Sequence, residues 1–394
     1  MRILFLTPRF PFPPDRGDRL FGYRLLETLV PHYEITLASF LGDDESEDRI
    51  EPVAKLGIEV HLVRRPRAFS WLQVLAALPG RDALQIAFYR SRRMGRLVDR
   101  LSRSPFDLAI AQMARMGPYG LRANARRRVV LLSDSIALSL SRRLEHESIW
   151  KRPLVRLEAE RMAAYERRIV TDYDSSWLVS TVDRDHFPAD LRQRLRVVPN
   201  GFPTEYLSVP LERPGRGRIL FVGHLGVPSN VAAAEDLALR VLPALEAMRP
   251  GTHLRLVGAD PAPAVRRLHD PPRVEVTGFV PDLRAEYANA DVFVAPLRWA
   301  AGVQNKLIEA MACGLPVVTS TIAAEGLGAQ SGVHLRTADG IEPTIEATRA
   351  LLDDPVEARA MAARGRAHIE QNFSWEASLR ALEEVLTAPP RAAK

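Results

Sequence analysis

The 394-residue sequence contains a single cysteine, Cys313, and no apolar stretch long enough to cross a bilayer. One cysteine excludes an intramolecular disulfide and a cysteine-cluster zinc site, and it suits a reducing compartment. A membrane-spanning helix needs roughly 20 consecutive apolar residues. The apolar run in the N-terminal MRILFLTPRF is too short for a signal peptide, and Pro8 interrupts it. We therefore expect a cytoplasmic protein.

Motifs that bind metals and dinucleotides are also missing. The histidines and acidic residues form no His-x-x-x-His or Asp-x-Asp grouping in the loops expected to carry the site, so we expect no metal. No Gly-x-Gly-x-x-Gly follows a predicted strand, which leaves a dinucleotide-dependent oxidoreductase with little support.

Positive charge is concentrated in the first half of the chain. Residues 1–200 hold 34 lysines and arginines against 25 acidic residues, whereas residues 201–394 hold 20 against 23. Basic clusters occur at residues 64–67, 90–96, 126–128 and 142–143. An apolar segment with an exposed-looking Trp71 lies between the first two clusters, which suits an anionic membrane surface, such as the inner face of the plasma membrane. The alternatives are a core helix among solvated arginines, and nucleic-acid binding, which no recognisable motif supports.

The order of the predicted elements indicates the fold class. With 46% hydrophobic and 26% charged residues, the chain is an ordinary globular protein with room for two domains. Short apolar runs that predict buried strands alternate with helical segments in two series. The first series has strands at residues 2–7, 34–39, 59–63, 107–111, 129–133, 176–180 and 195–198, and the second at residues 218–222, 253–257, 273–277, 291–295 and 315–319. Each series predicts a mostly parallel, doubly wound sheet with its binding site at the carboxyl ends of the strands.

A Pro-Asn-Gly turn at residues 199–201 and a linker-like PLERPGRG at residues 210–217 follow the first series. We expect an N-terminal domain of residues 1–200 and a second domain of residues 201–375. A C-terminal helix and tail, residues 376–394, would pack back on the first domain. The predicted class is α/β, with two Rossmann-like domains that face a central cleft.

The segment DVFVAPLRWAAGVQNKLIEAMACGLPVV, residues 291–318, carries the most chemistry. It predicts a buried strand, a turn at Ala301-Gly302 and a helix over Gln304–Cys313. The free N–H groups of that helix's first turn attract an anion, and Lys306 adds a full positive charge there. Glu309 lies at i+3 from Lys306, so both side chains face the same side. A cation for phosphate beside a carboxylate for sugar hydroxyls is the outline of a nucleotide-sugar site.

Four segments, in order along most of the chain, resemble the family-4 glycosyltransferases, which have the GT-B fold and retain the anomeric configuration of the sugar. They are the first strand with its proline-rich loop and Gly17, VVPNGF at residues 197–202, residues 274–296 and EAMACGLPVV at residues 309–318. Within this family, AGVQNKLIEAMA and PRFPFPPDRGDR are most similar to sugar transferases of bacterial exopolysaccharide clusters.

The resemblance implies a reaction and a set of site residues. It implies transfer of a sugar from a UDP- or GDP-linked donor to a saccharide or lipid-linked acceptor, without a metal or other cofactor. The product would belong to cell-surface polysaccharide or glycoconjugate synthesis. On the donor side it points to Gly17, Gly223, Phe279, Val280, Ala301, Gly302, Val303 and Glu309. On the acceptor side we expect Arg9, Gln112 and Arg115. Lys306, Glu309, His224 and Asp134 are the candidate catalytic residues.

The chain departs from the family pattern at three places. The first of the family's two motif glutamates falls on Ala301, so the backbone N–H groups of Ala301, Gly302 and Val303 would hold part of the donor sugar. A basic residue commonly follows the first glycine of the second domain, where this chain has His224, and Lys306 is expected to replace its charge. A His-Asp pair often ends a strand of the first domain, where this chain has Ser133-Asp134.

Each candidate also has a structural interpretation. Lys306 is otherwise one exposed lysine among others, Glu309 a member of a buried salt bridge, and His224 a structural histidine. Asp134 is otherwise a helix N-cap, and Asn230 reads more naturally as an N-cap for a helix over Val231–Leu245. Because the first motif glutamate is missing, an alternative function is that of a GT-B protein that binds a nucleotide or a partner without turnover. A nucleotide-sugar epimerase of the same fold is a further alternative.

Overall fold

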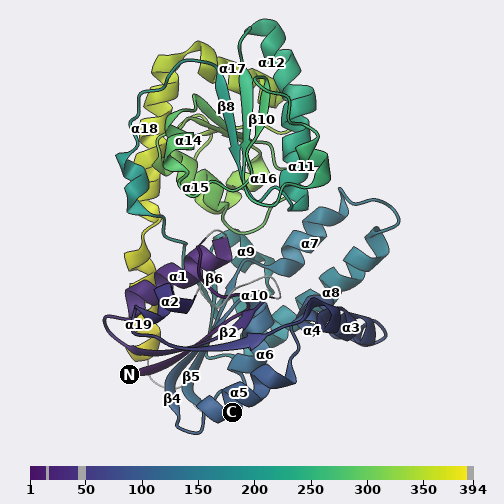
Figure 1. Ribbon diagram of the computed structural model, residues 1–394, viewed down its shortest axis with the longest axis vertical. Coiled ribbons are helices and arrows are strands. Elements are labelled where there is room, and N and C mark those ends of the chain that lie inside the picture. Colours follow the sequence, from purple (N-terminus) through teal and green to yellow (C-terminus); the bar gives the residue numbers. More distant parts are fainter. Residues whose placement is uncertain (15–16, 43–49, 388–394) are drawn as a thin grey trace. The chain divides into compact units, whose positions relative to one another are not determined.

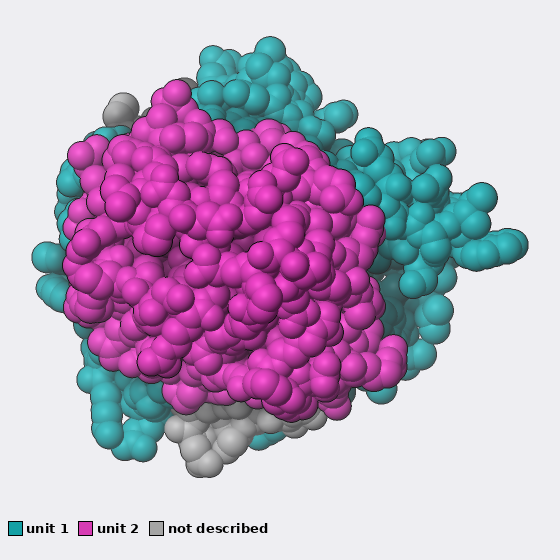
Figure 2. Space-filling view, turned by 90° about the horizontal axis from the view of Figure 1, so that it is seen from above, with its two compact units in different colours: residues 1–200, 375–394 teal, residues 201–374 magenta. Residues whose placement is uncertain are grey.

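The computed structural model describes residues 1–14, 17–42 and 50–387. The chain forms two compact units. Unit 1 contains residues 1–200 and 375–394, and unit 2 contains residues 201–374 (Figures 1 and 2). Trp375 therefore belongs to unit 1, together with the C-terminal helix that it begins.

Unit 1 is built on a seven-stranded, all-parallel sheet with the order β3-β2-β1-β4-β5-β6-β7. Its strands are β1 Arg2–Thr7, β2 Glu34–Leu41, β3 Glu59–Arg64, β4 Phe106–Gln112, β5 Ala125–Ser133, β6 Ser175–Leu178 and β7 Leu195–Val197. The central strands are continuous apolar runs because helices cover both faces of the sheet. The order reverses between β1 and β4, which places a switch point at the carboxyl ends of these two strands.

Eleven α-helices of the described residues accompany this sheet. They are α1 Gly17–Leu29, α2 Ile50–Ala54, α3 Arg67–Ala77, α4 Leu84–Phe88, α5 Arg92–Leu101, α6 Gly117–Gly120, α7 Ile136–Leu144, α8 Arg152–Asp172, α9 Thr181–His186, α10 Ala189–Arg192 and α19 Trp375–Thr387. Helices α7 and α8 pack against each other as a hairpin that projects from the rest of unit 1 (Figure 1). Helix α19 packs beside α1, where Leu382 and Val385 join one of the two apolar cores that flank the sheet.

Unit 2 repeats the design with a six-stranded parallel sheet of order β10-β9-β8-β11-β12-β13. Its strands are β8 Arg218–Val222, β9 His253–Val257, β10 Val274–Val276, β11 Val292–Ala295, β12 Val317–Thr319 and β13 Arg336–Thr337. Its helices are α11 Pro228–Asp236, α12 Leu242–Met248, α13 Pro263–Arg266, α14 Arg284–Ala288, α15 Asn305–Ala312, α16 Thr321–Ala324, α17 Ile341–Asp353 and α18 Pro355–Asn372. The two doubly wound, parallel α/β sheets predicted from the sequence are thereby confirmed.

Some boundaries differ from the predicted ones. The helix expected over residues 231–245 begins earlier, at Pro228, and a π-helical turn, Leu237–Val241, joins α11 to α12. A proline at the first helical position has no N–H to leave unpaired, which favours this earlier start. The two-residue strand β13 was not predicted, because two residues carry no periodic signal.

Candidate functional site

The switch point of unit 2 lies between β8 and β11, the two central strands of its sheet. Gly223 follows β8 and Gly258 follows the neighbouring strand β9, and the two backbones approach so closely that only glycine fits at position 258. A Cβ atom there would lie 1.6 Å from the Gly223 carbonyl oxygen, and φ of Gly258 is +154°. The turn after β8 therefore has a fixed shape at the edge where doubly wound sheets bind ligands.

Lys306 lies in the first turn of α15 and reaches across to the helix that follows β8. Its Nζ donates a hydrogen bond of 2.6 Å to Asn230 Oδ1 and lies 5.4 Å from the centre of the Phe221 ring. The side chain is half-buried. Burial lowers the pKa of Lys306 to about 8, although the nearby Glu309 acts in the opposite direction. The ammonium group is thus held without a carboxylate within ion-pair distance among the described residues, which suits it to receive an anion.

Asn230 is not the N-cap that the sequence suggested. It lies inside α11, is buried, and donates from Nδ2 to the carbonyl oxygen of His224 at 2.9 Å while its Oδ1 accepts from Lys306. The N-cap expectation was wrong because the helix begins at Pro228. Asn230 instead connects the turn after β8 to the first turn of α15.

Glu309 lies one turn below Lys306 and accepts a 3.0 Å hydrogen bond from the Tyr287 hydroxyl. Burial raises the pKa of Glu309 to about 7, against the opposing effects of this hydrogen bond and of the Lys306 charge. The Tyr287 ring is fully buried and packs edge-on against Tyr206, with ring centres 6.0 Å apart. One oxygen of Glu309 is therefore held by the hydroxyl of Tyr287, and any further hydrogen-bond donor that reaches the carboxylate stabilises its charged form.

The turn before α15 brings backbone close to the same place. Gly302 has φ of +66°, and a Cβ atom on Gly326 would lie 2.5 Å from the Gly302 carbonyl oxygen. Val303 is buried, whereas Ala301 and Gly302 are half-buried. Within the described part of the chain, no side chain caps the N-terminus of α15, whose positive end points toward this turn.

His224 follows Gly223 and is held from two sides. Its Nε2 lies 3.0 Å from an Asp260 carboxylate oxygen, and its Nδ1 lies 3.3 Å from the Gly226 nitrogen, which donates to it. These contacts fit a histidine that shapes the turn, and they leave its predicted contact with a phosphate or sugar as a proposal.

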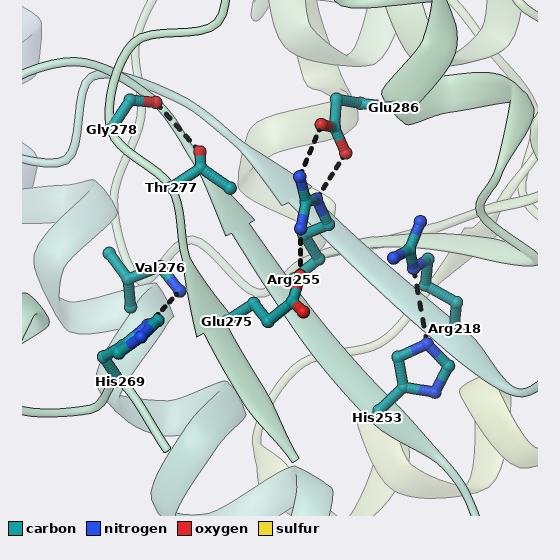
Figure 3. Close-up of polar contacts among 9 residues, drawn as sticks. All are labelled: Arg218, His253, Arg255, His269, Glu275, Val276, Thr277, Gly278 and Glu286. Carbon is teal, nitrogen blue, oxygen red and sulfur yellow. Dashed lines mark hydrogen bonds and ion pairs between the residues drawn. The ribbon is translucent and has the colours of Figure 1, made fainter. Parts of the chain in front are cut away.

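Phe279 and Val280 follow β10 in a loop whose start is tied to the sheet. The N–H of Gly258 donates to the Gly278 carbonyl oxygen at 3.0 Å. Nearby, Arg255 of β9 holds Glu275 of β10 and Glu286 of α14, with a 2.7 Å bond from Nη2 to Glu286 (Figure 3). The Phe279 side chain is 56% exposed, so its ring and the adjacent backbone are open to a planar ligand group.

Two further contacts at this edge of unit 2 could not be predicted from the sequence. Arg298, just after β11, makes a bidentate ion pair with the buried Asp236 of α11, at 2.8 and 2.9 Å. Tyr287, the partner of Glu309, is the other. Both pairs join residues 22 or more positions apart, and no local pattern marks them.

In unit 1 the acceptor-side candidates gather at the switch point between β1 and β4. Arg9, after β1, pairs with Asp18 at 2.5 Å, and Gln112, at the end of β4, donates to the Asp18 carbonyl oxygen at 2.6 Å. Gly17 begins α1 directly before Asp18. Burial favours a raised pKa for Asp18, but the Arg9 ion pair outweighs it and the pKa is lowered. Arg115 turns away toward Gln85, to which it donates at 2.8 Å.

Asp134 follows β5 and is half-buried. Burial, together with the nearby Asp183 carboxylate, raises the pKa of Asp134 to about 6. The N-cap of α7 is the next residue, Ser135, whose hydroxyl accepts from the Leu138 N–H at 3.1 Å. The N-cap interpretation of Asp134 was therefore wrong, and a proton-accepting role remains open to it.

Known proteins resemble this chain in sequence over part of its length and in structure over most of it. Residues 216–354 match the family of group 1 glycosyl transferases. This segment contains all of the unit 2 side chains discussed above except Tyr206.

Two curated relatives are mannosyltransferases. One is the GDP-mannose-dependent monoacylated alpha-(1-6)-phosphatidylinositol monomannoside mannosyltransferase of Corynebacterium glutamicum, 33% identical over 174 residues, which are 40% of this chain. The other is the GDP-mannose-dependent alpha-(1-6)-phosphatidylinositol monomannoside mannosyltransferase of Mycolicibacterium smegmatis, 28% identical over 306 residues, which are 71% of this chain. The matched parts span 44% of the first relative and 75% of the second.

Solved structures resemble the chain over nearly its whole length. HepE of Anabaena, in complex with UDP and glucose, superposes with a TM-score of 0.67 at 18% identity and covers 98% of this chain and 100% of its own. Sucrose-phosphate synthase of Thermosynechococcus elongatus gives a TM-score of 0.69 at 19% identity and covers 97% of this chain and 98% of its own. These likenesses confirm the predicted GT-B fold.

Two further observations concern metals and membranes. Within the described residues, no three His, Cys, Asp or Glu side chains form a group suited to a metal ion. In the same part of the chain, no helix is both long and apolar enough to cross a membrane.

Proposed function

We propose that this protein is a retaining glycosyltransferase that moves a sugar from a nucleotide-diphosphate donor to a saccharide or lipid-linked acceptor. The observation that carries the proposal is the pair formed by Lys306 and Glu309. Both are half-buried on α15 at the switch point of unit 2, and both have pKa values shifted by burial toward their neutral forms. Ligand groups of opposite polarity, a diphosphate for the lysine and ribose hydroxyls for the carboxylate, would restore both charges.

Glycosyl transfer requires stabilisation of a departing nucleoside diphosphate. In this proposal Lys306 and the N–H groups of the turn at residues 301–303 face the diphosphate, where preorganised donors supply on the order of 2.7–4 kcal/mol each. Because Ala301 has no carboxylate, backbone N–H groups of this turn also hold the donor sugar. The backbone around Phe279 and Val280 reads the base. We name no protein nucleophile, since in retaining transfer on one face of the sugar the leaving phosphate assists the acceptor.

The donor and the absence of a metal are also part of the proposal. The two curated relatives described above are named as GDP-mannose-dependent enzymes, and HepE was solved with UDP. GDP-mannose is therefore the first donor to test, and UDP-sugars are the second. Lys306 would provide beside the diphosphate the charge that Mg²⁺ provides at other nucleotide sites, so we propose that no metal is needed. Asp134 is proposed to accept the proton of the acceptor.

An anionic membrane is the proposed location of the acceptor. Helix α3 exposes Phe69, Trp71, Leu72 and Leu75, with Trp71 61% exposed. At the tip of the α7–α8 hairpin, Trp150 is 90% exposed. Apolar side chains with arginines around them favour the interface of an anionic bilayer. A cell-surface polysaccharide or glycoconjugate would then be the product.

The test begins with calorimetric titration of UDP, GDP and ADP without metal. Micromolar binding of one nucleotide, weakened at least tenfold (about 1.4 kcal/mol) in Glu309→Ala and Lys306→Ala, supports the site. Lys55→Ala and Glu342→Ala remove exposed charges elsewhere and should bind as the natural protein does. Binding of none of the three nucleotides would overturn the proposal.

Turnover separates the remaining alternatives. Release of the nucleotide from the matching sugar donor, followed by nuclear magnetic resonance of the glycosylated product, should show the donor's anomeric configuration. A donor that binds but never reacts would point to the non-catalytic alternative. Conversion of the donor into its epimer without an acceptor would identify the epimerase.

A further inference from the structure

Unit 1 contains a large arginine-lined cavity that has no part in the donor site. Its volume is about 970 Å³, at the upper end of the usual range for ligand pockets. The lining includes a single carboxylate, Asp82. The lining arginines are Arg81, Arg90, Arg92, Arg96, Arg115, Arg122, Arg161 and Arg168.

Aromatic rings of fixed orientation form the inner wall of this cavity. The Tyr119 hydroxyl donates to the Tyr89 carbonyl oxygen at 2.7 Å, and the Tyr165 hydroxyl donates to the Ala114 carbonyl oxygen at 2.9 Å. The hydroxyl groups of Tyr119 and Tyr165 are used by the backbone, and Tyr89, Tyr119 and Tyr165 are all buried, so the three rings act as a rigid support. The cavity is therefore built from ordered parts of the fold.

Several of the arginines have charge left over for a ligand. Arg90 pairs with Asp82 at 2.6 Å, and Arg122 is held by Asp99. Arg81 and Arg92, in contrast, are exposed and have no hydrogen-bond acceptor among the described residues. Arg115 reaches in from the end of β4, and its Nε is buried without an acceptor in the described structure.

So many guanidinium groups in one hollow repel one another unless an anion sits among them. A planar guanidinium binds phosphate oxygens through two parallel hydrogen bonds, so phosphate is the anion that this arrangement fits best. The space exceeds what one phosphate ion needs, which favours a ligand that carries further groups.

The cavity also adjoins the apolar helix α3. Arg161 donates to the carbonyl oxygens of Ala77 and Leu78 at 3.2 and 2.8 Å, which fixes the C-terminal end of α3 at the rim. The rim continues through Arg81 and Asp82. The exposed apolar side chains of α3, none of which lines the cavity, belong to the same helix. A charged hollow that opens beside an apolar surface matches an amphiphile.

We propose that this cavity binds the phosphate or diphosphate group of a lipid-linked acceptor, with the lipid chain leaving along α3. That the lipid is the acceptor rests on the proposed function, whereas binding of the lipid phosphate does not. The proposal adds to the membrane surface described above a specific site for one head group.

The test is calorimetric titration of the full chain with dihexanoyl phosphatidic acid below its micellar concentration, beside inorganic pyrophosphate and dihexanoyl phosphatidylcholine. The short-chain phosphatidic acid should bind at least tenfold more tightly than either of the other two. Pyrophosphate binding of equal strength would overturn the assignment to a lipid, and equal binding of phosphatidylcholine would overturn the role of the arginines.

Paired variants locate the binding. Arg81→Ala/Arg92→Ala removes two arginines of this cavity and should weaken phosphatidic acid at least tenfold. Arg100→Ala/Arg103→Ala is the matched control, because it removes two exposed arginines that line a neighbouring hollow beside β3 and α5 and are absent from the lining of this cavity. Equal affinities in the two double variants would overturn the proposal.

The same variants separate this inference from the proposed function. Arg81→Ala/Arg92→Ala should keep the natural protein's affinity for the nucleotide. If this double variant loses phosphatidic acid binding but keeps nucleotide binding, the cavity is assigned as the lipid-phosphate site. If phosphatidic acid binds as expected while no nucleotide does, the cavity stands and the glycosyltransferase proposal fails.

Discussion

Replacement of Lys306 by methionine tests the donor site most directly. Methionine keeps an apolar stem of similar length beside the Phe221 ring and removes the charge. A hydrogen bond to a charged group contributes about 1.5–3 kcal/mol, which corresponds to about a ten- to hundredfold loss of nucleotide affinity. The fold should persist, because Lys306 Nζ donates to a neutral amide, that of Asn230, and forms no ion pair within the described residues.

The pH dependence makes this prediction more specific. The pKa of Lys306 is lowered to about 8, so the ammonium form dominates only below that pH. A bound diphosphate stabilises the ammonium and raises this pKa, so binding takes up a proton as the pH rises through about 8. The natural protein should therefore lose affinity above this pH, by up to about tenfold per pH unit. The Lys306→Met protein lacks this titrating ammonium group, so its weaker affinity should not fall as the pH rises through 8.

The assay is calorimetry of the preferred nucleoside diphosphate between pH 7 and 9.5, in buffers of different ionisation enthalpy. Proton uptake near pH 8.5 in the natural protein, absent from Lys306→Met, is the expected signature. Lys55→Met, which removes an exposed lysine directly after α2, should behave as the natural protein. An affinity of Lys306→Met within twofold of the natural value, with the same pH profile, would refute the reasoning.

Three further predictions concern other parts of the fold. Gly258→Ala places a Cβ atom against the Gly223 carbonyl oxygen and should lower the unfolding free energy by about 3 kcal/mol or more in denaturant titrations. Gly251→Ala is the control: its φ is +88° but the space around it is open, so the unfolding free energy should fall by only about 1–2 kcal/mol. Tyr287→Phe removes the hydrogen bond that lowers the pKa of Glu309, so this pKa should rise. The loss of nucleotide affinity on acidification, expected near pH 7, should then begin up to about one pH unit higher in calorimetry. Leu75→Glu should reduce sedimentation with anionic vesicles, and the equally exposed Leu239→Glu of unit 2 should not; equal effects would contradict the membrane surface.

The local order of the site could be predicted from the sequence, because its strand, turn and helix are contiguous. The spacing of Lys306 and Glu309 already places them on one side of α15. Their partners could not be predicted, since Asn230 lies 76 residues from Lys306 and Tyr287 lies 22 residues from Glu309. The incorrect N-cap assignment of Asn230 has the same origin: the capping preference of asparagine is local, whereas its actual contacts are tertiary.

The cavity of unit 1 shows the same limit on a larger scale. Its arginines come from α5, the long helix α8 and the loops near α4 and α6, and in the sequence they appear only as an excess of positive charge. That excess alone is compatible with solvated arginines around a core helix as well as with an anionic membrane surface. The arrangement of the guanidinium groups around one hollow appears only when four elements are brought together.

The position of α19 has a consequence for how the protein is made. This helix completes an apolar core of unit 1, where Arg127 donates to the Val385 carbonyl oxygen at 2.5 Å and Arg196 pairs with Glu384 at 2.7 Å. Unit 1 is therefore discontinuous in the chain, whereas unit 2, residues 201–374, is one uninterrupted segment. During synthesis the ribosome delivers the whole of unit 2 before the last piece of unit 1. Unit 2 can therefore fold first, whereas unit 1 can complete its apolar core only after α19 has left the exit tunnel.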